Sequence, residues 1–133
     1  MKYYTLEEAD AVLPDVIPVL EALRDAFVEL RALEASVAAQ RRGATGDGHL
    51  MADPWDEGSG ENRAEALSRA IRQAAGRLDR WGIELKDPEK GLIDFFHVRG
   101  GKTVYLCYCL GETAIGYWHE LNTGFAGRQP LER

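Results

Sequence analysis

Residues 92–119 read LIDFFHVRGGKTVYLCYCLGETAIGYWH, and this stretch decides the fold. It is rich in β-branched and aromatic residues, and the turn sequences Gly100-Gly101 and Gly111-Glu112-Thr113 divide it into three segments. Short turns between such segments predict an antiparallel meander. The predicted strands cover residues 92–98, 103–110 and 114–119, and residues 83–85 add a short edge strand.

Upstream of the meander the sequence predicts helices. Thr5-Leu6-Glu7-Glu8 is a capping box, in which the Thr5 hydroxyl and the Glu8 carboxylate each accept a hydrogen bond from the other's backbone N–H. Pro14 and Pro18 follow, and proline inside a helix removes a hydrogen bond and crowds the preceding turn. We therefore expect a short first helix over residues 6–13, then a kink, and a long helix that begins near Asp15 or Pro18.

Two stretches have apolar residues at heptad spacing. The first consists of Leu13, Val16, Leu20, Leu23, Phe27 and Leu30, and resumes at Val37; the second consists of Ala64, Leu67, Ile71, Ala74, Leu78 and Trp81. A glycine-rich loop over residues 43–60, either mobile or functional, separates them. Two such helices joined by a loop indicate an antiparallel hairpin over residues 5–82, with the second helix covering about residues 61–82.

These elements predict an α+β fold in a single domain, residues 1–133. A long antiparallel helical hairpin with a short N-terminal helix packs with a small antiparallel meander of three to four strands. The meander and a glycine-punctuated tail occupy residues 83–133.

Composition excludes some functions. A formal net charge of −6 argues against a nucleic-acid partner and against an anionic membrane surface. No apolar run approaches the ~20 residues of a membrane span, and the N-terminus lacks the apolar stretch of a signal peptide. Cys107 and Cys109, two apart in a predicted strand, would form a strained disulfide, so we expect two thiols in the reducing cytoplasm.

Most of the residues that could carry chemistry lie in the last third of the chain, and the register of the last hairpin decides which of them meet. A two-residue turn at Glu112-Thr113 places Cys107, Cys109 and Trp118 on one face and His119 on the other. A three-residue loop shifts the pairing by one and places Cys107 opposite His119. Thiolate and imidazole would then suit a transition metal or haem iron, although only two ligands are apparent. The alternative is that both residues are structural.

Asp94 stands in an apolar strand and needs a partner, for which Arg128 is the natural candidate because its planar fork suits a carboxylate. This pair is either a structural salt bridge that ties the tail to the sheet or part of a polar pocket. Such a pocket would hold Asp94, Glu112, His119 and Arg128, with Trp118 as a further ligand-binding candidate. The glycines around Arg128, in Gly124-Phe125-Ala126-Gly127-Arg128, are a plain turn or an anion-binding nest.

The chain resembles a small bacterial family catalogued as a conserved domain of unknown function. The resemblance lies in Tyr4-Thr5-Leu6-Glu7-Glu8-Ala9, Gly82-Ile83-Glu84-Leu85-Lys86, Gly91-Leu92-Ile93-Asp94-Phe95, and the C-terminal pattern LC-x-x-LGE, WH and GFAGR. The matching motif positions include Asp94, Cys107, Glu112, Trp118, His119 and Arg128. The chain departs from the family at Phe96, Tyr108 and Cys109, where members usually have proline, tryptophan and a basic residue. The resemblance implies a bacterial, cytoplasmic home and no particular activity.

Three functional hypotheses follow. The first is a ligand- or metal-binding module with its polar site on the meander. The second is an interaction module, in which the heptad-patterned helices form a homodimer or dock a partner helix and the polar cluster is structural. The third is a small hydrolase or isomerase with His119 as base, oriented by Asp94 or Glu112.

Overall fold

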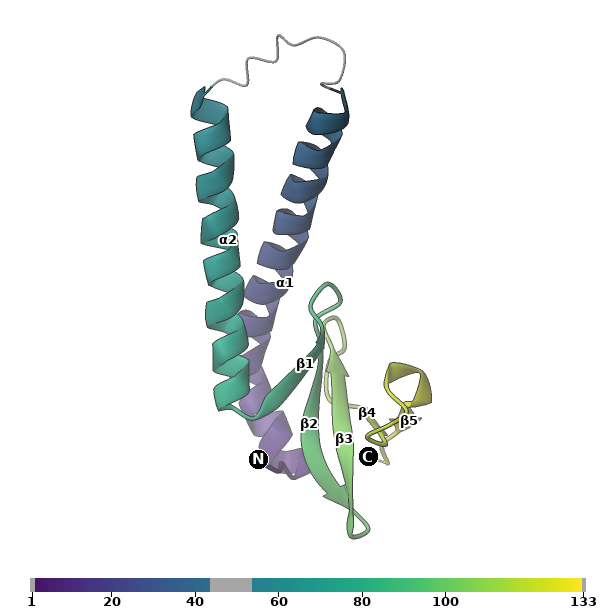
Figure 1. Cartoon of the computed structure of the whole chain (residues 1–133). Coiled ribbons are helices and arrows are strands. Elements are labelled where there is room, and N and C mark those ends of the chain that lie inside the picture. The colour runs from purple at the N-terminus through teal and green to yellow at the C-terminus, as the bar shows by residue number, and fades with distance from the viewer. Residues whose placement is uncertain (1, 44–53, 133) are drawn as a thin grey trace.

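The computed structural model describes residues 2–43 and 54–132. Two long helices, α1 (Leu6–Gly43) and α2 (Pro54–Arg80), form the antiparallel hairpin, which extends well beyond the end of the sheet (Figure 1). The sheet follows in sequence and has the strand order β1-β2-β3-β4-β5, with every neighbouring pair antiparallel. Its strands are β1 (Ile83–Asp87), β2 (Leu92–Arg99), β3 (Lys102–Cys109), β4 (Tyr117–His119) and β5 (Gln129–Pro130). The predicted α+β class is confirmed, with five strands instead of three to four.

The start of α1 combines a confirmed prediction with a wrong one. The capping box forms, since Thr5 N–H donates to Glu8 Oε1 at 2.9 Å and Glu8 N–H donates to Thr5 Oγ1 at 3.1 Å. The short first helix does not exist, because α1 runs without a break through Pro14 and Pro18. Both prolines are solvent-exposed and lie four residues apart on one side of the helix, where water can replace the lost hydrogen bonds.

The second helix begins earlier than its predicted start at residue 61. Residues 54–60, which we assigned to the loop, form the first turns of α2. The centre of that predicted loop, residues 44–53, lies outside the described residues. Along the predicted seam of α1 the burial is graded: Leu20 and Leu23 are fully buried, Phe27 and Leu30 are half-buried, and Val37 is exposed.

The sheet has two faces with different roles. Phe95 and Leu106 are directly paired between β2 and β3, and both belong to the core that includes α1 and α2 side chains. Because side chains alternate along a strand, the neighbouring pair Asp94 and Cys107 points to the opposite face. We call this second face, turned away from the helices, the outer face.

The last part of the meander differs most from the prediction. The two-residue turn Gly100-Gly101 is present, with both φ angles positive as the tight hairpin requires. Residues 110–116, however, form a long connection in place of a tight turn, and Ile115 within it is fully buried in the core. The third predicted strand therefore shortens to β4, Tyr117–His119. The tail contains a short 3₁₀ helix, Phe125–Gly127, and β5.

We expect Leu20→Ala to lower the free energy of unfolding by about 2–5 kcal/mol, because it opens a cavity where α1 meets the core. Leu121→Ala is the control, since Leu121 is half exposed and its loss should cost within about 0.5 kcal/mol. Urea denaturation measures both. Equal losses for the two variants would contradict the placement of the core.

Candidate functional site

Three side chains that can ligate a metal meet on the outer face, each from a different strand. Asp94 on β2 is directly opposite Cys107 on β3, and His119 on β4 is opposite Tyr105, the next outward-facing position of β3. One ligand atom from each residue lies within 4.8 Å of the other two. The three residues are almost completely buried, with exposed fractions of 1%, 0% and 2%. We call them the Asp-Cys-His cluster.

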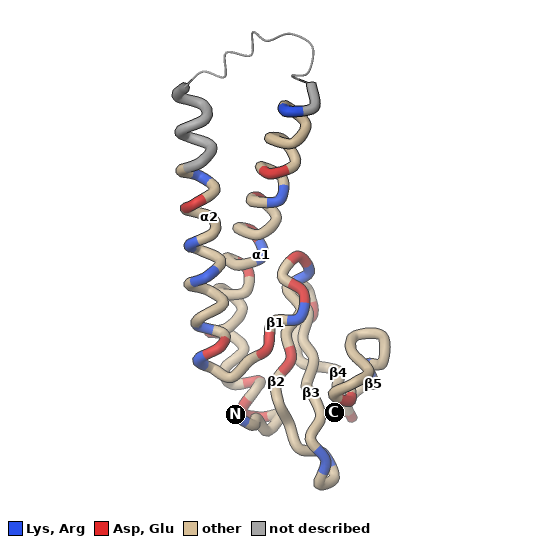
Figure 2. The backbone as a smooth tube through the Cα atoms, in the orientation of Figure 1, with Lys and Arg blue, Asp and Glu red and all other residues tan. Residues whose placement is uncertain are grey.

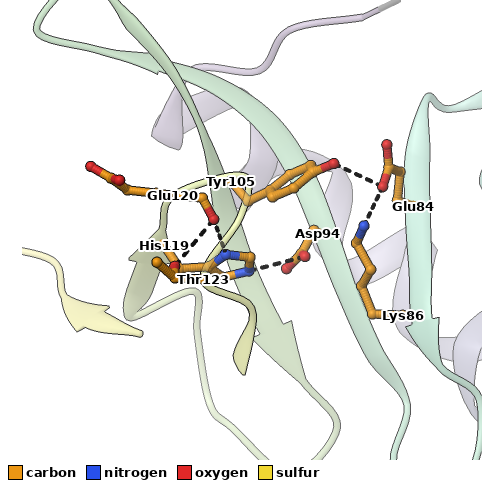
Figure 3. A network of polar contacts seen from close by, with 7 residues as sticks. All are labelled: Glu84, Lys86, Asp94, Tyr105, His119, Glu120 and Thr123. Carbon is orange, nitrogen blue, oxygen red and sulfur yellow. Dashed lines mark hydrogen bonds and ion pairs between the residues drawn. The ribbon is translucent and has the colours of Figure 1, made fainter. Parts of the chain in front are cut away.

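The two ring nitrogens of His119 have different partners (Figure 3). Nδ1 lies 2.7 Å from the backbone oxygen of Glu120, which can only accept, so Nδ1 carries a proton. Nε2 lies 3.0 Å from Asp94 Oδ2. A hydrogen bond there needs one more proton, on Nε2 or on the carboxyl group. The ring is thus held with Nε2 directed into the cluster.

The two carboxylate oxygens of Asp94 have different surroundings. Oδ2 contacts His119, whereas Oδ1 is buried and has no hydrogen-bond partner. Burial raises the pKa of Asp94, and the contacts with His119 and with the Cys107 thiol oppose this rise only in part. The cluster therefore contains an acceptor atom that is shielded from water and not satisfied by the protein, which is uncommon in native structures.

Cys107 forms the third corner of the cluster as a free thiol. Burial and the neighbouring Asp94 carboxylate both raise the pKa of the Cys107 thiol, while the charge of Arg128 lowers it to a smaller extent. The Cys107 thiol therefore keeps its proton at neutral pH. A thiol in this environment is not a nucleophile, but a bound metal ion would stabilise its thiolate.

A second polar contact, Glu112–Arg128, lies at the other end of β4. Arg128 Nη2 donates to Glu112 Oε2 at 2.6 Å, and the side chains are only 12% and 24% exposed. The other oxygen, Glu112 Oε1, accepts from the backbone N–H of Cys109 at 2.7 Å. The Arg128 guanidinium also lies over the ring of Tyr117, 3.9 Å from its centroid, and Tyr117 pairs directly with Cys107.

The predicted partner of Asp94 was wrong. Asp94 pairs with His119, and Arg128 pairs with Glu112, so the four residues of the predicted pocket form two separate contacts. The two contacts are close enough for Arg128 to act on the Cys107 thiol. Asp94 contacts His119 because the register between β3 and β4 places the His119 ring on the outer face, beside Asp94.

Of the two alternative registers, the three-residue loop gave the correct face but the wrong partner. It placed Cys107 and His119 on one face, as observed, but directly opposite each other. In the structure Cys107 is opposite Tyr117, so the pairing of β3 with β4 is shifted by two residues from this alternative, and residues 110–116 lie outside the ladder. Trp118 points to the other face, where it packs against the core, and it takes no part in the cluster.

Sequence reasoning missed a polar network beside the cluster. The Tyr105 hydroxyl donates to Glu84 Oε2 at 2.9 Å, and Lys86 Nζ lies 2.5 Å from the same oxygen (Figure 3). The Tyr105 ring lies 5.3 Å, centroid to centroid, from His119 and covers it on this side. Alternation along β3 could have placed Tyr105 on the same face as Cys107. The positions of Glu84 and Lys86 could not be predicted, because they depend on how β1 pairs with β2.

No pocket described for residues 2–43 and 54–132 opens onto the cluster. The larger one, about 520 Å³, is lined by Lys2, Asp79, Arg80, Gly82, Ile83, Glu84 and Phe96. In the glycine-rich segment before Arg128, the N–H groups of Gly127 and Arg128 donate within the turn and are not available to an anion. The geometry is therefore that of a closed centre.

The family of the chain can now be stated. Residues 2–131 match the model of the family described as "Uncharacterized conserved protein (DUF2203)". The chain belongs to this family. Neither a curated protein nor a solved structure matches the chain. None of the helices described for this DUF2203 member is both long and apolar enough to cross a membrane.

We expect His119→Ala to destabilise the fold by about 3–5 kcal/mol, because it leaves the buried Asp94 carboxyl without its partner. In a double-mutant cycle with Asp94→Ala, the combined loss should be smaller than the sum by about 1–3 kcal/mol. Urea denaturation measures the four proteins.

The matched control is the cycle Lys102→Ala with Glu120→Ala, which removes an exposed ion pair between β3 and the residue that follows β4. That pair should couple by less than about 1 kcal/mol. Additive losses for Asp94 and His119 would contradict the buried contact.

Proposed function

We propose that this chain is a metal-binding module whose centre is the Asp-Cys-His cluster. The observation that carries the proposal is a buried set of oxygen, sulfur and nitrogen ligands with an unsatisfied carboxylate oxygen among them. A carboxylate, a thiolate and an imidazole are the ligands of Zn²⁺ and of similar divalent transition metals.

The orientation of His119 supports the proposal. Histidines that ligate metals commonly donate their second ring N–H to a backbone carbonyl, which fixes the tautomer. His119 Nδ1 donates in this way to the Glu120 oxygen and leaves Nε2 as the ligand atom. An ion would replace the proton between Nε2 and Asp94. In a tetrahedral zinc site, ligand atoms lie about 3.3–3.8 Å apart. The three ligand atoms lie within 4.8 Å of one another, so an ion would draw the most distant of them closer, while Nε2 and Oδ2, now 3.0 Å apart, would separate slightly.

The closed geometry favours a structural role for the ion. The protein supplies three ligands, and Asp94 Oδ1 or one water is left for the fourth position. A haem fits less well, because it needs a wide apolar cavity and neither described pocket includes the cluster. The same burial disfavours His119 as the base of a hydrolase or isomerase. The ion would fasten β4 to β2 and β3, in a protein that we place in the cytoplasm because both thiols are free.

We expect metal-depleted protein to bind one Zn²⁺ or Co²⁺ per chain, and Cys107→Ser to weaken this binding at least about a hundredfold. The Co²⁺ form should show a thiolate charge-transfer band in the near ultraviolet, which Cys107→Ser abolishes. Calorimetry and absorption spectroscopy measure the two effects.

Cys109→Ser is the matched control, because Cys109 lies on the same strand but its sulfur contacts the backbone oxygen of Lys90. This variant should keep both the binding and the absorption band. The centre would be ruled out if the protein with both cysteines binds no ion, or if Cys107→Ser and Cys109→Ser weaken binding equally.

Self-association through the hairpin is a second candidate function, and the graded burial of the α1 seam favours it. Beyond Leu23 the seam is covered less and less, until Val37 is 37% exposed. In the described parts of the helices, α1 carries mostly Asp and Glu and α2 carries mostly Arg (Figure 2), so contact between α1 of one copy and α2 of another would bring opposite charges together. The prediction that nucleic acid is not a partner stays untested.

If two copies pair through the seam, the mass in solution should be twice that of the chain at micromolar concentrations, and Val37→Glu should restore the monomer. Val28→Glu is the control, because Val28 is also exposed, at 46%, but lies on the opposite side of α1. Sedimentation equilibrium measures the mass. A monomer throughout the concentration range would count against this function.

A further inference from the structure

We propose that the Glu112–Arg128 contact is a latch that holds the C-terminal segment, residues 120–131, over the Asp-Cys-His cluster, and that its opening admits the ion. The second half of this proposal, the entry of the ion, rests on the proposed metal centre. The latch itself, however, is testable on the metal-free protein.

The need for an opening follows from burial. The three ligating residues are at most 2% exposed, and neither described pocket includes any of them. A hydrated ion cannot reach Asp94 or Cys107 in the closed protein. Part of the structure around the cluster must therefore move before an ion can bind.

The C-terminal segment covers the cluster from the β4 side. Its first turn contacts His119, since Glu120 oxygen accepts from both His119 Nδ1 and the Thr123 hydroxyl (Figure 3). Farther along the segment, Arg128 lies on the ring of Tyr117, the residue directly paired with Cys107. The segment thus touches residues at both ends of β4, the strand that supplies His119.

The latch connects this segment to the end of β3. Glu112 is fixed at one side by the Cys109 N–H, which donates to Oε1, and at the other by Arg128, which donates to Oε2. The contact closes a loop that contains β4. Because both side chains are mostly buried, the pair is shielded from water and salt far more than a surface ion pair.

The other attachments of the segment lie mainly near its two ends. At the start are the His119 bond to Glu120 oxygen and the exposed Lys102–Glu120 ion pair. At the end are the two-residue pairing of β4 with β5, the Leu131 N–H bond to Gly116 oxygen and the packing of Leu131 against the core, and Lys90 contacts the Phe125 ring between them. Residues 121–126 are exposed. Arg128 Nε is buried without a partner, so the guanidinium does not bind Glu112 through two parallel hydrogen bonds. Segments with so few buried contacts open locally, without global unfolding.

The test is the rate at which a thiol reagent labels Cys107 in metal-free protein that carries Cys109→Ser. Glu112→Gln keeps the shape and the acceptor for Cys109 N–H but removes the charge that holds Arg128. We divide each labelling rate by the rate in the denatured chain, and expect Glu112→Gln to raise this ratio at least tenfold. Because the opening is local, the rate should not change when low concentrations of urea are added. Lys102→Gln, which breaks the exposed ion pair of the same segment, should change the rate less than twofold.

The outcomes separate the latch from the metal centre. An unchanged rate in Glu112→Gln, a rate that rises equally in Lys102→Gln, or a rate that follows global unfolding would overturn the latch. If Glu112→Gln does not fold, Arg128→Lys replaces it and should label at least threefold faster, since its point charge lacks the planar stacking on Tyr117. Faster labelling in a protein that binds no Zn²⁺ would support the latch and refute the metal centre.

Discussion

The contact between Asp94 and His119 is the constraint around which the sheet is arranged. An ionisable carboxyl in the middle of β2, 1% exposed, has to find a partner inside the protein, because an unpaired charge there would cost several kcal/mol. That partner comes from β4, a strand of three residues with little pairing of its own. The position of β4, and through it the C-terminal segment, therefore depends on a polar contact as much as on the sheet ladder.

The helical hairpin makes this arrangement possible because it covers the other face of the sheet. Ile93, Phe95 and Leu106 pack with Leu20 and Leu78 from the two helices in a core that needs no polar residue. Alternation along the same strands then delivers Asp94 and Cys107 to the outer face as a direct consequence. One face supplies most of the hydrophobic stabilisation, and the other is free to hold an ionisable cluster.

Local signals in the sequence predicted local structure well. The capping box at Thr5 and Glu8 and the glycine turn at Gly100-Gly101 are contacts between near neighbours, and both formed as expected. The break predicted at Pro14 and Pro18 was wrong, because the effect of a proline depends on whether its side of α1 faces solvent. That is a property of the tertiary structure.

The candidate site was predicted in its residues but not in its pairing. Asp94, Cys107 and His119 were identified from residue type, and one register alternative placed the last two on a common face. The partner of Asp94 could not follow from the sequence, because it depends on the register between β3 and β4. No tight turn fixes that register, since residues 110–116 lie outside the ladder and Ile115 among them is buried in the core.

Our proposal of an ion, in place of a purely structural contact, rests on the chemistry of the cluster. A buried pair of ionisable residues is often no more stable than apolar residues of the same volume, so stability alone does not explain the pair. Nor does it explain why Asp94 Oδ1 is left without a partner in a position shielded from water. The third corner is a thiol whose proton is held by burial and by the carboxylate beside it. A divalent ion would remove each of these costs at once, since it satisfies Oδ1, neutralises the carboxylate and stabilises the thiolate.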